Sequence, residues 1–156
     1  MANVVLIGAT GFVGSAILNE LLSRGHKVTA VVRNAAKLPQ NDNLTAVEED
    51  VANVDAIANI AKGKDAVISS YNPGWNNPQM GKINDENYPK IVEAVKKSGV
   101  QRLLIVGGAG TLFVKPGLRV VDSGFIPAEI MDGVRPLGEF YLNFLTKEHD
   151  LDWAFF

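Results

Sequence analysis

The chain has 156 residues, of which 47% are hydrophobic and 21% charged, and its formal net charge at pH 7 is −2. This length predicts one compact domain, and the composition argues against disorder and against a basic nucleic-acid-binding protein. The absence of cysteine rules out disulfides, thiolate metal sites and a cysteine nucleophile. We find no signal sequence and no run approaching the roughly 18 apolar residues of a membrane span, so we expect a cytoplasmic chain.

Short apolar segments alternate with segments of helical periodicity. Strands are expected at residues 4–7, 28–32, 66–68 and 103–106, with weaker candidates at 44–47 and 153–156. Helices are expected at residues 12–24, 52–61, 85–98 and 135–149. Pro89 would then lie in the first turn of the third helix, where proline is tolerated. The alternation predicts an α/β fold, namely a doubly wound parallel sheet of the Rossmann type in one domain spanning residues 1–156.

Two connections are longer than usual, at residues 71–84 and 107–134. Both follow the carboxyl end of an expected strand, which is where ligands bind in open α/β sheets. Because long loops in a compact domain are usually functional, we interpret both as binding loops.

The sequence GATGFVG at residues 8–14 follows the first expected strand and opens the first expected helix. Gly8 would permit the tight turn, Gly11 would let the backbone approach a pyrophosphate, and Gly14 would let the helix pack on the sheet. The helix N-terminus would offer free N–H groups to the anion. We therefore expect nucleotide contacts at Gly8, Thr10, Gly11, Phe12, Val13 and Gly14.

The run VVLIGATGFVG at residues 4–14 resembles the opening of extended and atypical short-chain dehydrogenase/reductases. The similarity continues through VVR at 31–33, EDV at 49–51 and DAVIS at 65–69. VGGAG at 106–110 and LDW at 151–153 resemble a subgroup described as NAD-dependent epimerase/dehydratases or NADH-flavin reductases. This resemblance covers essentially the whole chain. Related chains continue past the LDW run, so it also implies that the C-terminal part of the substrate side is missing here.

The resemblance implies further cofactor contacts beyond the glycine-rich turn. Asp50 and Val51 would lie against the adenine, although Asp50 could equally cap the next helix. By the same resemblance, the segment that closes the fourth strand would border the ribose and pyrophosphate, and the start of the second long loop would lie beside the nicotinamide. These contacts are Ser69, Ser70, Tyr71, Gly107 and Gly108.

Arg33 stands at the end of the second strand, where a Rossmann unit distinguishes NAD from NADP. A carboxylate at this point would bind the ribose hydroxyls, whereas a guanidinium suits a 2′-phosphate. The sequence therefore favours NADP(H), and NAD(H) is the alternative if Arg33 merely faces solvent.

The Tyr-x-x-x-Lys pair that shuttles protons in typical short-chain dehydrogenases is absent. The residue four positions after Tyr71, Tyr88 and Tyr141 is never lysine, and glycines replace the serine expected after the fifth strand. We therefore assign no catalytic residue and no metal ligand. A flavin or quinone acceptor would need no dedicated acid, because it can take its proton from water. The small residues at 107–110 would either leave room for such an acceptor or simply permit a turn.

Tyr71, Trp75 and Phe113 lie in the two long loops and could stack on such an acceptor, or could anchor their loops to the core. Tyr141 has the helical spacing of a core residue.

Three functions remain in competition. The first is an NAD(P)-dependent oxidoreductase of the atypical short-chain type, reducing a flavin-like or quinone-like molecule. The second is a non-catalytic NAD(P) sensor, since the nitrogen-metabolite regulators keep the glycine turn and lack the dyad. The third, ranked lowest, is a sugar-nucleotide epimerase or dehydratase. In each case the expected partner is a small molecule, with no nucleic acid or membrane, and the chain would be a monomer or homodimer.

Overall fold

The computed structural model describes residues 1–156 and contains one sheet of six parallel strands in the order β3-β2-β1-β4-β5-β8. The strands are β1 (Asn3–Ile7), β2 (Lys27–Val32), β3 (Leu44–Glu48), β4 (Ala66–Ser69), β5 (Arg102–Ile105) and β8 (Asp152–Phe155). The strand order reverses beside β1, so that the carboxyl ends of β1 and β4 border a crevice. The Rossmann-type parallel sheet expected from the sequence is confirmed.

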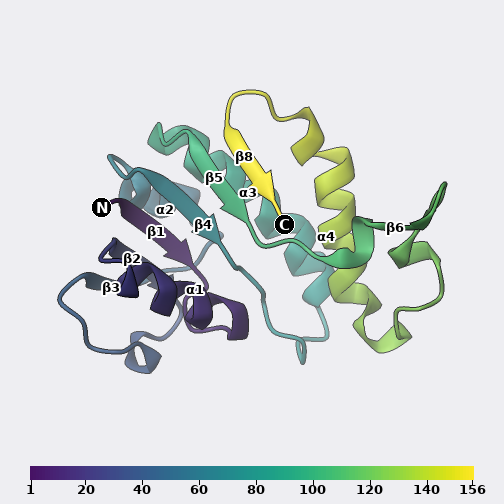
Figure 1. Cartoon of the computed structure of the whole chain (residues 1–156), viewed down its shortest axis with the longest axis horizontal. Helices are drawn as coiled ribbons and strands as arrows, with labels where there is room; N and C mark the ends of the chain where they lie inside the picture. Colours follow the sequence, from purple (N-terminus) through teal and green to yellow (C-terminus); the bar gives the residue numbers. More distant parts are fainter.

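Helices cover the two faces of the sheet unequally (Figure 1). The helix α1 (Phe12–Ser23) packs on one face, while α2 (Val54–Ala61), α3 (Met80–Ser98) and α4 (Met131–Asn143) pack on the other. Successive residues of β1 supply both cores, because Val5 and Ile7 face the larger cluster and Leu6 faces the smaller one. No helix has the length and apolar character needed to cross a bilayer.

The structure corrects the expected start of α3. This helix begins at Met80 rather than near residue 85, so Pro89 lies in its interior and not in its first turn. The early turns are held by burial, since Met80 is 4% exposed and Asn84 is fully buried. Pro89 removes only the hydrogen bond to the carbonyl of Asp85, an exposed residue that water can reach. Burial of the first two turns therefore outweighs the proline signal.

The last expected helix is likewise displaced. The helix α4 runs over Met131–Asn143, and a short 3₁₀ turn, η5 (Leu145–Lys147), follows it. Pro136 lies inside α4. Four further 3₁₀ turns occupy the connections, namely η1 (Ala35–Lys37), η2 (Ala109–Thr111), η3 (Val120–Asp122) and η4 (Ala128–Ile130).

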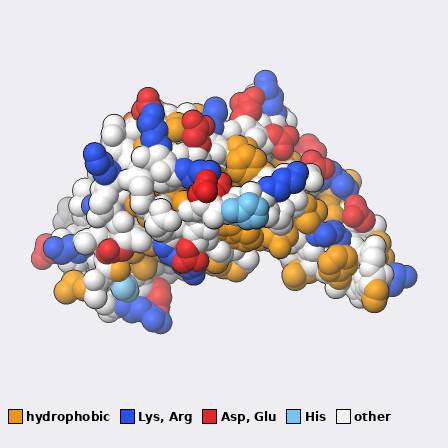
Figure 2. All heavy atoms as spheres, turned by 90° about the horizontal axis from the view of Figure 1, so that it is seen from above, with side chains coloured by type: hydrophobic (Ala, Val, Ile, Leu, Met, Phe, Trp, Pro, Cys, Tyr) orange, Lys and Arg blue, Asp and Glu red, His pale blue; other side chains and the backbone are white.

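A projecting hairpin within the second long connection has no counterpart in the expected elements. Its strands β6 (Phe113–Lys115) and β7 (Leu118–Arg119) pair antiparallel across Gly117, whose φ of +79° favours glycine. Figure 1 shows the hairpin extending beyond the sheet, and Figure 2 shows hydrophobic side chains on this end of the molecule. The guanidinium of Arg119 lies 4.7 Å above the Phe113 ring.

Candidate functional site

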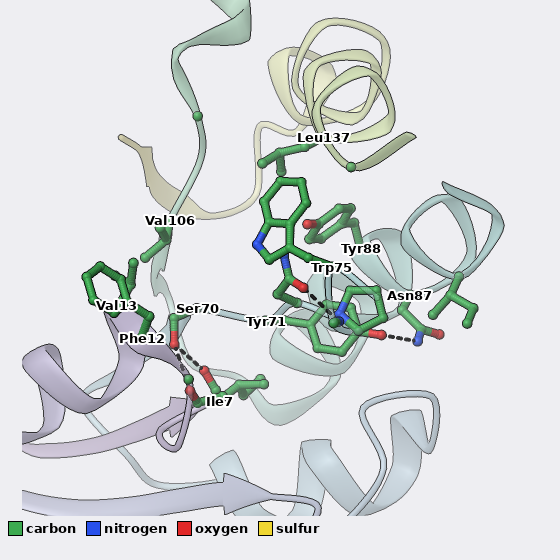
Figure 3. Close-up of a pocket in the computed structure, with 18 of the residues that line it drawn as sticks. Ile7, Phe12, Val13, Ser70, Tyr71, Trp75, Asn87, Tyr88, Val106 and Leu137 are labelled. Atoms are coloured by element: carbon green, nitrogen blue, oxygen red, sulfur yellow. Dashed lines mark hydrogen bonds between the residues drawn. The ribbon is translucent and has the colours of Figure 1, made fainter. Parts of the chain in front are cut away.

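A pocket of about 810 Å³ opens at the carboxyl edge of the sheet, between the glycine-rich turn and the two long connections (Figure 3). Most of the residues singled out in the sequence line it. These are Gly8, Thr10, Gly11, Phe12, Val13, Arg33, Asp50, Val51, Ser70, Tyr71, Trp75, Gly107 and Gly108. Gly14, Ser69 and Phe113 do not line the pocket. Phe113 was expected to stack on an acceptor, but it belongs to the projecting hairpin and is 59% exposed.

The glycine-rich turn is held against β4 by Ser70. The Ser70 hydroxyl lies 2.9 Å from the Ile7 carbonyl and 3.2 Å from the Gly8 carbonyl, and donates to this pair of acceptors. Gly8 has a φ of +82°, which favours glycine. A Cβ on Gly14 would lie 2.6 Å from the Ser70 Oγ and closer still to the Gly8 carbonyl. Close packing of α1 on the turn therefore requires glycine at position 14.

The N-terminus of α1 is open to an anion. Gly11 is its N-cap and supplies no side-chain hydrogen bond, and the first turn contains no acidic residue. A Cβ on Gly11 would be 3.4 Å from its nearest neighbour, the Gly8 carbonyl oxygen, so protein packing alone does not require glycine there. Because Gly11, Phe12 and Val13 line the pocket, the uncapped N–H groups border it. This arrangement fits a pyrophosphate, which accepts hydrogen bonds from such groups.

Two cations, Arg33 and Lys37, line the same pocket, and neither forms an ion pair. One Arg33 nitrogen lies 3.5 Å from the Pro73 carbonyl, at the limit of a hydrogen bond. Lys37 is positioned by the turn η1, and two hydrogen bonds fix the backbone of this turn. Asn34 accepts from the Ala36 amide at 2.9 Å, and Glu48 accepts from the Ala35 amide at 2.7 Å.

Lys37 was missed in the sequence because a three-residue turn has no periodicity. The only local sequence signal for this turn is Asn34, which can act as a cap before the two alanines that follow it.

Asp50 combines a structural contact with a place in the pocket. One carboxylate oxygen accepts a hydrogen bond from the Ala52 amide at 2.8 Å. It therefore closes the turn before α2, while Asn53 is the N-cap and accepts from the Ala56 amide at 3.3 Å. The helix cap suggested as the alternative role of Asp50 is thus provided by Asn53, whereas the place of Asp50 in the pocket suits the contact with adenine.

Two tyrosines lie on the side of the pocket opposite the glycine turn (Figure 3). The Tyr71 hydroxyl accepts a hydrogen bond from the Asn87 amide at 2.8 Å. The rings of Tyr71 and Tyr88 meet edge to face at 5.9 Å, and Tyr88 stacks on Phe140 at 5.2 Å. Burial raises the pKa of Tyr71 despite the Asn87 hydrogen bond, and burial together with Tyr71 raises the pKa of Tyr88. Both phenols are therefore neutral at physiological pH.

Packing contacts that the sequence did not indicate explain why glycines follow β5. A Cβ on Gly107 would lie 2.5 Å from Cζ of Phe155, and a Cβ on Gly110 would lie 2.7 Å from Cγ1 of Val134. Both glycines therefore allow this segment to pack against β8 and α4, while still lining the pocket.

Two further aromatic residues, Trp75 and Tyr141, divide between the pocket and the core. Trp75 is 58% exposed and packs beside Gly133, where a Cβ would lie 2.5 Å from the indole. Tyr141 stacks on Phe155 at 4.7 Å and packs against the main core, as its spacing predicts.

Several known proteins are similar to this chain in sequence or in fold. The chain is 52% identical to a candidate epimerase from Bacteroides thetaiotaomicron, whose structure it matches with a TM-score of 0.89 over 99% of this chain and 69% of that chain. A candidate NADH-flavin reductase from Streptococcus pneumoniae TIGR4 is 28% identical, with a TM-score of 0.79 over 99% of this chain and 70% of that one. The uncharacterised protein YwnB of Bacillus subtilis is 34% identical, covering 96% of this chain and 68% of its own.

The model of one protein family, described as NAD(P)H-binding, matches residues 8–153. This match begins at the glycine-rich turn and extends into β8, so it includes every lining residue of the pocket except Ile7. With the parallel sheet, the uncapped helix and the structural neighbours of epimerase and NADH-flavin reductase type, the match identifies this chain as a member of the NAD(P)H-binding family.

Proposed function

We propose that the chain binds NADP(H) in this pocket and catalyses hydride transfer to a small, flat acceptor of the flavin or quinone kind. The observation that carries the proposal is the combination, in one pocket, of a glycine turn beside an uncapped helix with two cations that have no ion-pair partner. A 2′-phosphate distinguishes NADP from NAD, and Arg33 and Lys37 are suited to bind it.

Each part of the pocket takes a separate role in this proposal. The N-terminus of α1 binds the pyrophosphate, and Ser70 keeps the turn in the required shape. NADPH supplies the hydride when bound. The apolar side of the pocket, with Trp75 and Leu137, excludes water and offers a flat surface to the acceptor. No lysine lines that side of the pocket to act with a tyrosine, which favours an acceptor that takes its proton from water.

The absence of a tyrosine–lysine pair also supports a second candidate, a sensor that binds NAD(P) without turnover. An epimerase, as in the description of the Bacteroides relative, ranks below both because sugar oxidation needs a tyrosine base.

The decisive experiment measures NADPH binding by the protein and NADPH oxidation at 340 nm with flavin mononucleotide and with a naphthoquinone. We expect saturable binding and protein-dependent oxidation with at least one acceptor. Tight binding without turnover on any acceptor would support the sensor and contradict the oxidoreductase. A lack of binding would contradict both.

A further inference from the structure

Tyr88 is the buried polar residue of the pocket whose hydroxyl has no partner. Its side chain is 4% exposed, and its ring is fixed between Phe140 and Tyr71. Figure 3 shows its hydroxyl turned toward the interior of the pocket. The other pocket tyrosine differs, because the Tyr71 hydroxyl is already bonded to Asn87.

An unpaired hydroxyl in this position is unusual. Buried tyrosine hydroxyls normally find a hydrogen-bond partner within the protein, and this one has none. The unpaired atoms of Asn84 are fully enclosed by protein, whereas the Tyr88 oxygen is open to the pocket. The Trp75 indole N–H also lacks a protein partner, but Trp75 is 58% exposed and water satisfies it. Tyr88 is therefore a largely buried donor that a ligand in the pocket can bond in place of water.

The surroundings of Tyr88 define the ligand. Apolar groups, including Leu137 and Trp75, line this part of the pocket. Burial raises the pKa of Tyr88, so the hydroxyl keeps its proton and acts as a donor. A donor set in an apolar surface selects a flat, apolar molecule that carries one acceptor oxygen.

We propose that the Tyr88 hydroxyl donates a hydrogen bond to a ring carbonyl of a quinone, which is the acceptor of the reaction. This inference rests on the proposed function and adds the chemical class of the acceptor and the residue that recognises it. The overall change is NADPH + H⁺ + quinone → NADP⁺ + hydroquinone. One carbonyl oxygen of the quinone takes the hydride as the C4–H bond of NADPH breaks, and so becomes a hydroxyl. The two electrons make the ring aromatic and leave the other carbonyl oxygen, the one bonded to Tyr88, as an oxyanion, which then takes a proton from water. Tyr88 stays protonated and stabilises that oxyanion.

The first test is a binding titration without NADPH, so that no reaction occurs. The full chain is titrated with 1,4-naphthoquinone and, separately, with naphthalene, following tryptophan fluorescence because Trp75 lines the pocket. Without cysteine, the protein cannot form thiol adducts with the quinone. We expect Tyr88→Phe to weaken quinone binding about three- to tenfold, the worth of one neutral hydrogen bond, and to leave naphthalene binding unchanged. Equal quinone affinity in both proteins would overturn the inference.

The second test compares turnover. Tyr88→Phe should lower kcat/KM for the naphthoquinone by about 10- to 100-fold, because the lost bond strengthens as charge develops on oxygen. It should affect reduction of flavin mononucleotide less, since the hydride goes to a flavin nitrogen. Tyr141→Phe is the matched control, because Tyr141 packs on Phe155 outside the pocket. This variant should leave kcat/KM unchanged for both the naphthoquinone and flavin mononucleotide.

The two tests separate this inference from the proposed function. Equal quinone turnover in wild type and Tyr88→Phe would overturn the role of Tyr88 and leave the oxidoreductase standing. If wild type neither binds nor oxidises NADPH, the proposed function fails, and the titration without NADPH still decides whether Tyr88 binds a carbonyl. A loss of naphthalene affinity in Tyr88→Phe would reveal a collapsed pocket and would contradict the hydrogen-bond explanation.

Discussion

The glycine-turn side of the pocket and the acceptor side are built in different ways. On the first side, residues close in sequence and one hydroxyl from β4 fix the backbone, through the Ser70 contacts to the Ile7 and Gly8 carbonyls. On the second side, α3, α4 and both long connections contribute separate side chains, and Trp75 is largely exposed. Changes that move the backbone of the first side should therefore affect folding and cofactor binding together, whereas changes on the second side should affect the acceptor.

The largest effect should come from Gly14→Ala. The added methyl group meets the Ser70 hydroxyl and the Gly8 carbonyl, so the turn must move, at a cost of about 1–3 kcal/mol in the free energy of unfolding. NADPH binding should fall about 100-fold or more. Gly11→Ala is the matched comparison, because its methyl group fits the protein but would occupy the space of a pyrophosphate. Its thermal midpoint should be unchanged while NADPH binding is lost, and an unchanged affinity would refute the placement of the pyrophosphate.

Arg33→Ala should have the next largest effect, and only on one nucleotide. Loss of a charged hydrogen bond to the 2′-phosphate should weaken the binding of NADPH about 10- to 100-fold and that of NADH by less than threefold. Lys37→Ala should show the same selectivity with a smaller loss, because a lysine binds phosphate as a point charge. Calorimetric titration of both variants with both nucleotides measures this. Equal losses for NADPH and NADH would show that the cations do not bind the 2′-phosphate.

Ser70→Ala should have a moderate effect. It removes the hydroxyl that ties the glycine turn to β4, but the Ser70 amide still donates to the Ile7 carbonyl at 3.0 Å. We expect a loss of about 1 kcal/mol in the free energy of unfolding, measured by urea titration, with a weaker affinity for NADPH. A normal affinity in a destabilised variant would mean that the turn keeps its shape without the hydroxyl.

The smallest effect should arise far from the pocket. Lys96 bonds to Glu148 at 2.9 Å and to Asp150 at 2.7 Å. These contacts lower the pKa of Asp150 and, against the opposing effect of burial, that of Glu148. Because both pKa values are lower in the folded state, the stabilisation is present above the unfolded values near 4 and is lost as pH falls through the folded values.

Lys96→Met should therefore lower the thermal midpoint slightly at pH 7 and less at pH 3. Melting curves across this range are the measurement, and a larger loss at pH 3 than at pH 7 would contradict the assignment.

The same contrast explains what could be predicted from the sequence. The strands β1 and β2, the helix α1 and the glycine turn were predicted because their signals are local. The start of α3 was not, because burial of Met80 and Asn84 against the rest of the protein outweighs the signal of Pro89.

On the acceptor side, the sequence indicated the loops but not which residues meet. Tyr88 has the spacing of a core residue, and only the fold shows that its hydroxyl opens into the pocket. The glycines at 107 and 110 were interpreted as space or as a turn, whereas contacts with Phe155 and Val134 from later elements require them. Lys37 joins Arg33 only through the fold of a short turn.

The central claim is that this pocket binds NADP(H) through the uncapped α1 terminus and the two cations. Calorimetric titration of the unmodified chain with NADPH and with NADH tests it most directly. The account predicts one site per chain with NADPH bound at least about tenfold more tightly, as expected for one added charged contact. Equal or tighter binding of NADH, or no binding of either nucleotide, would contradict it.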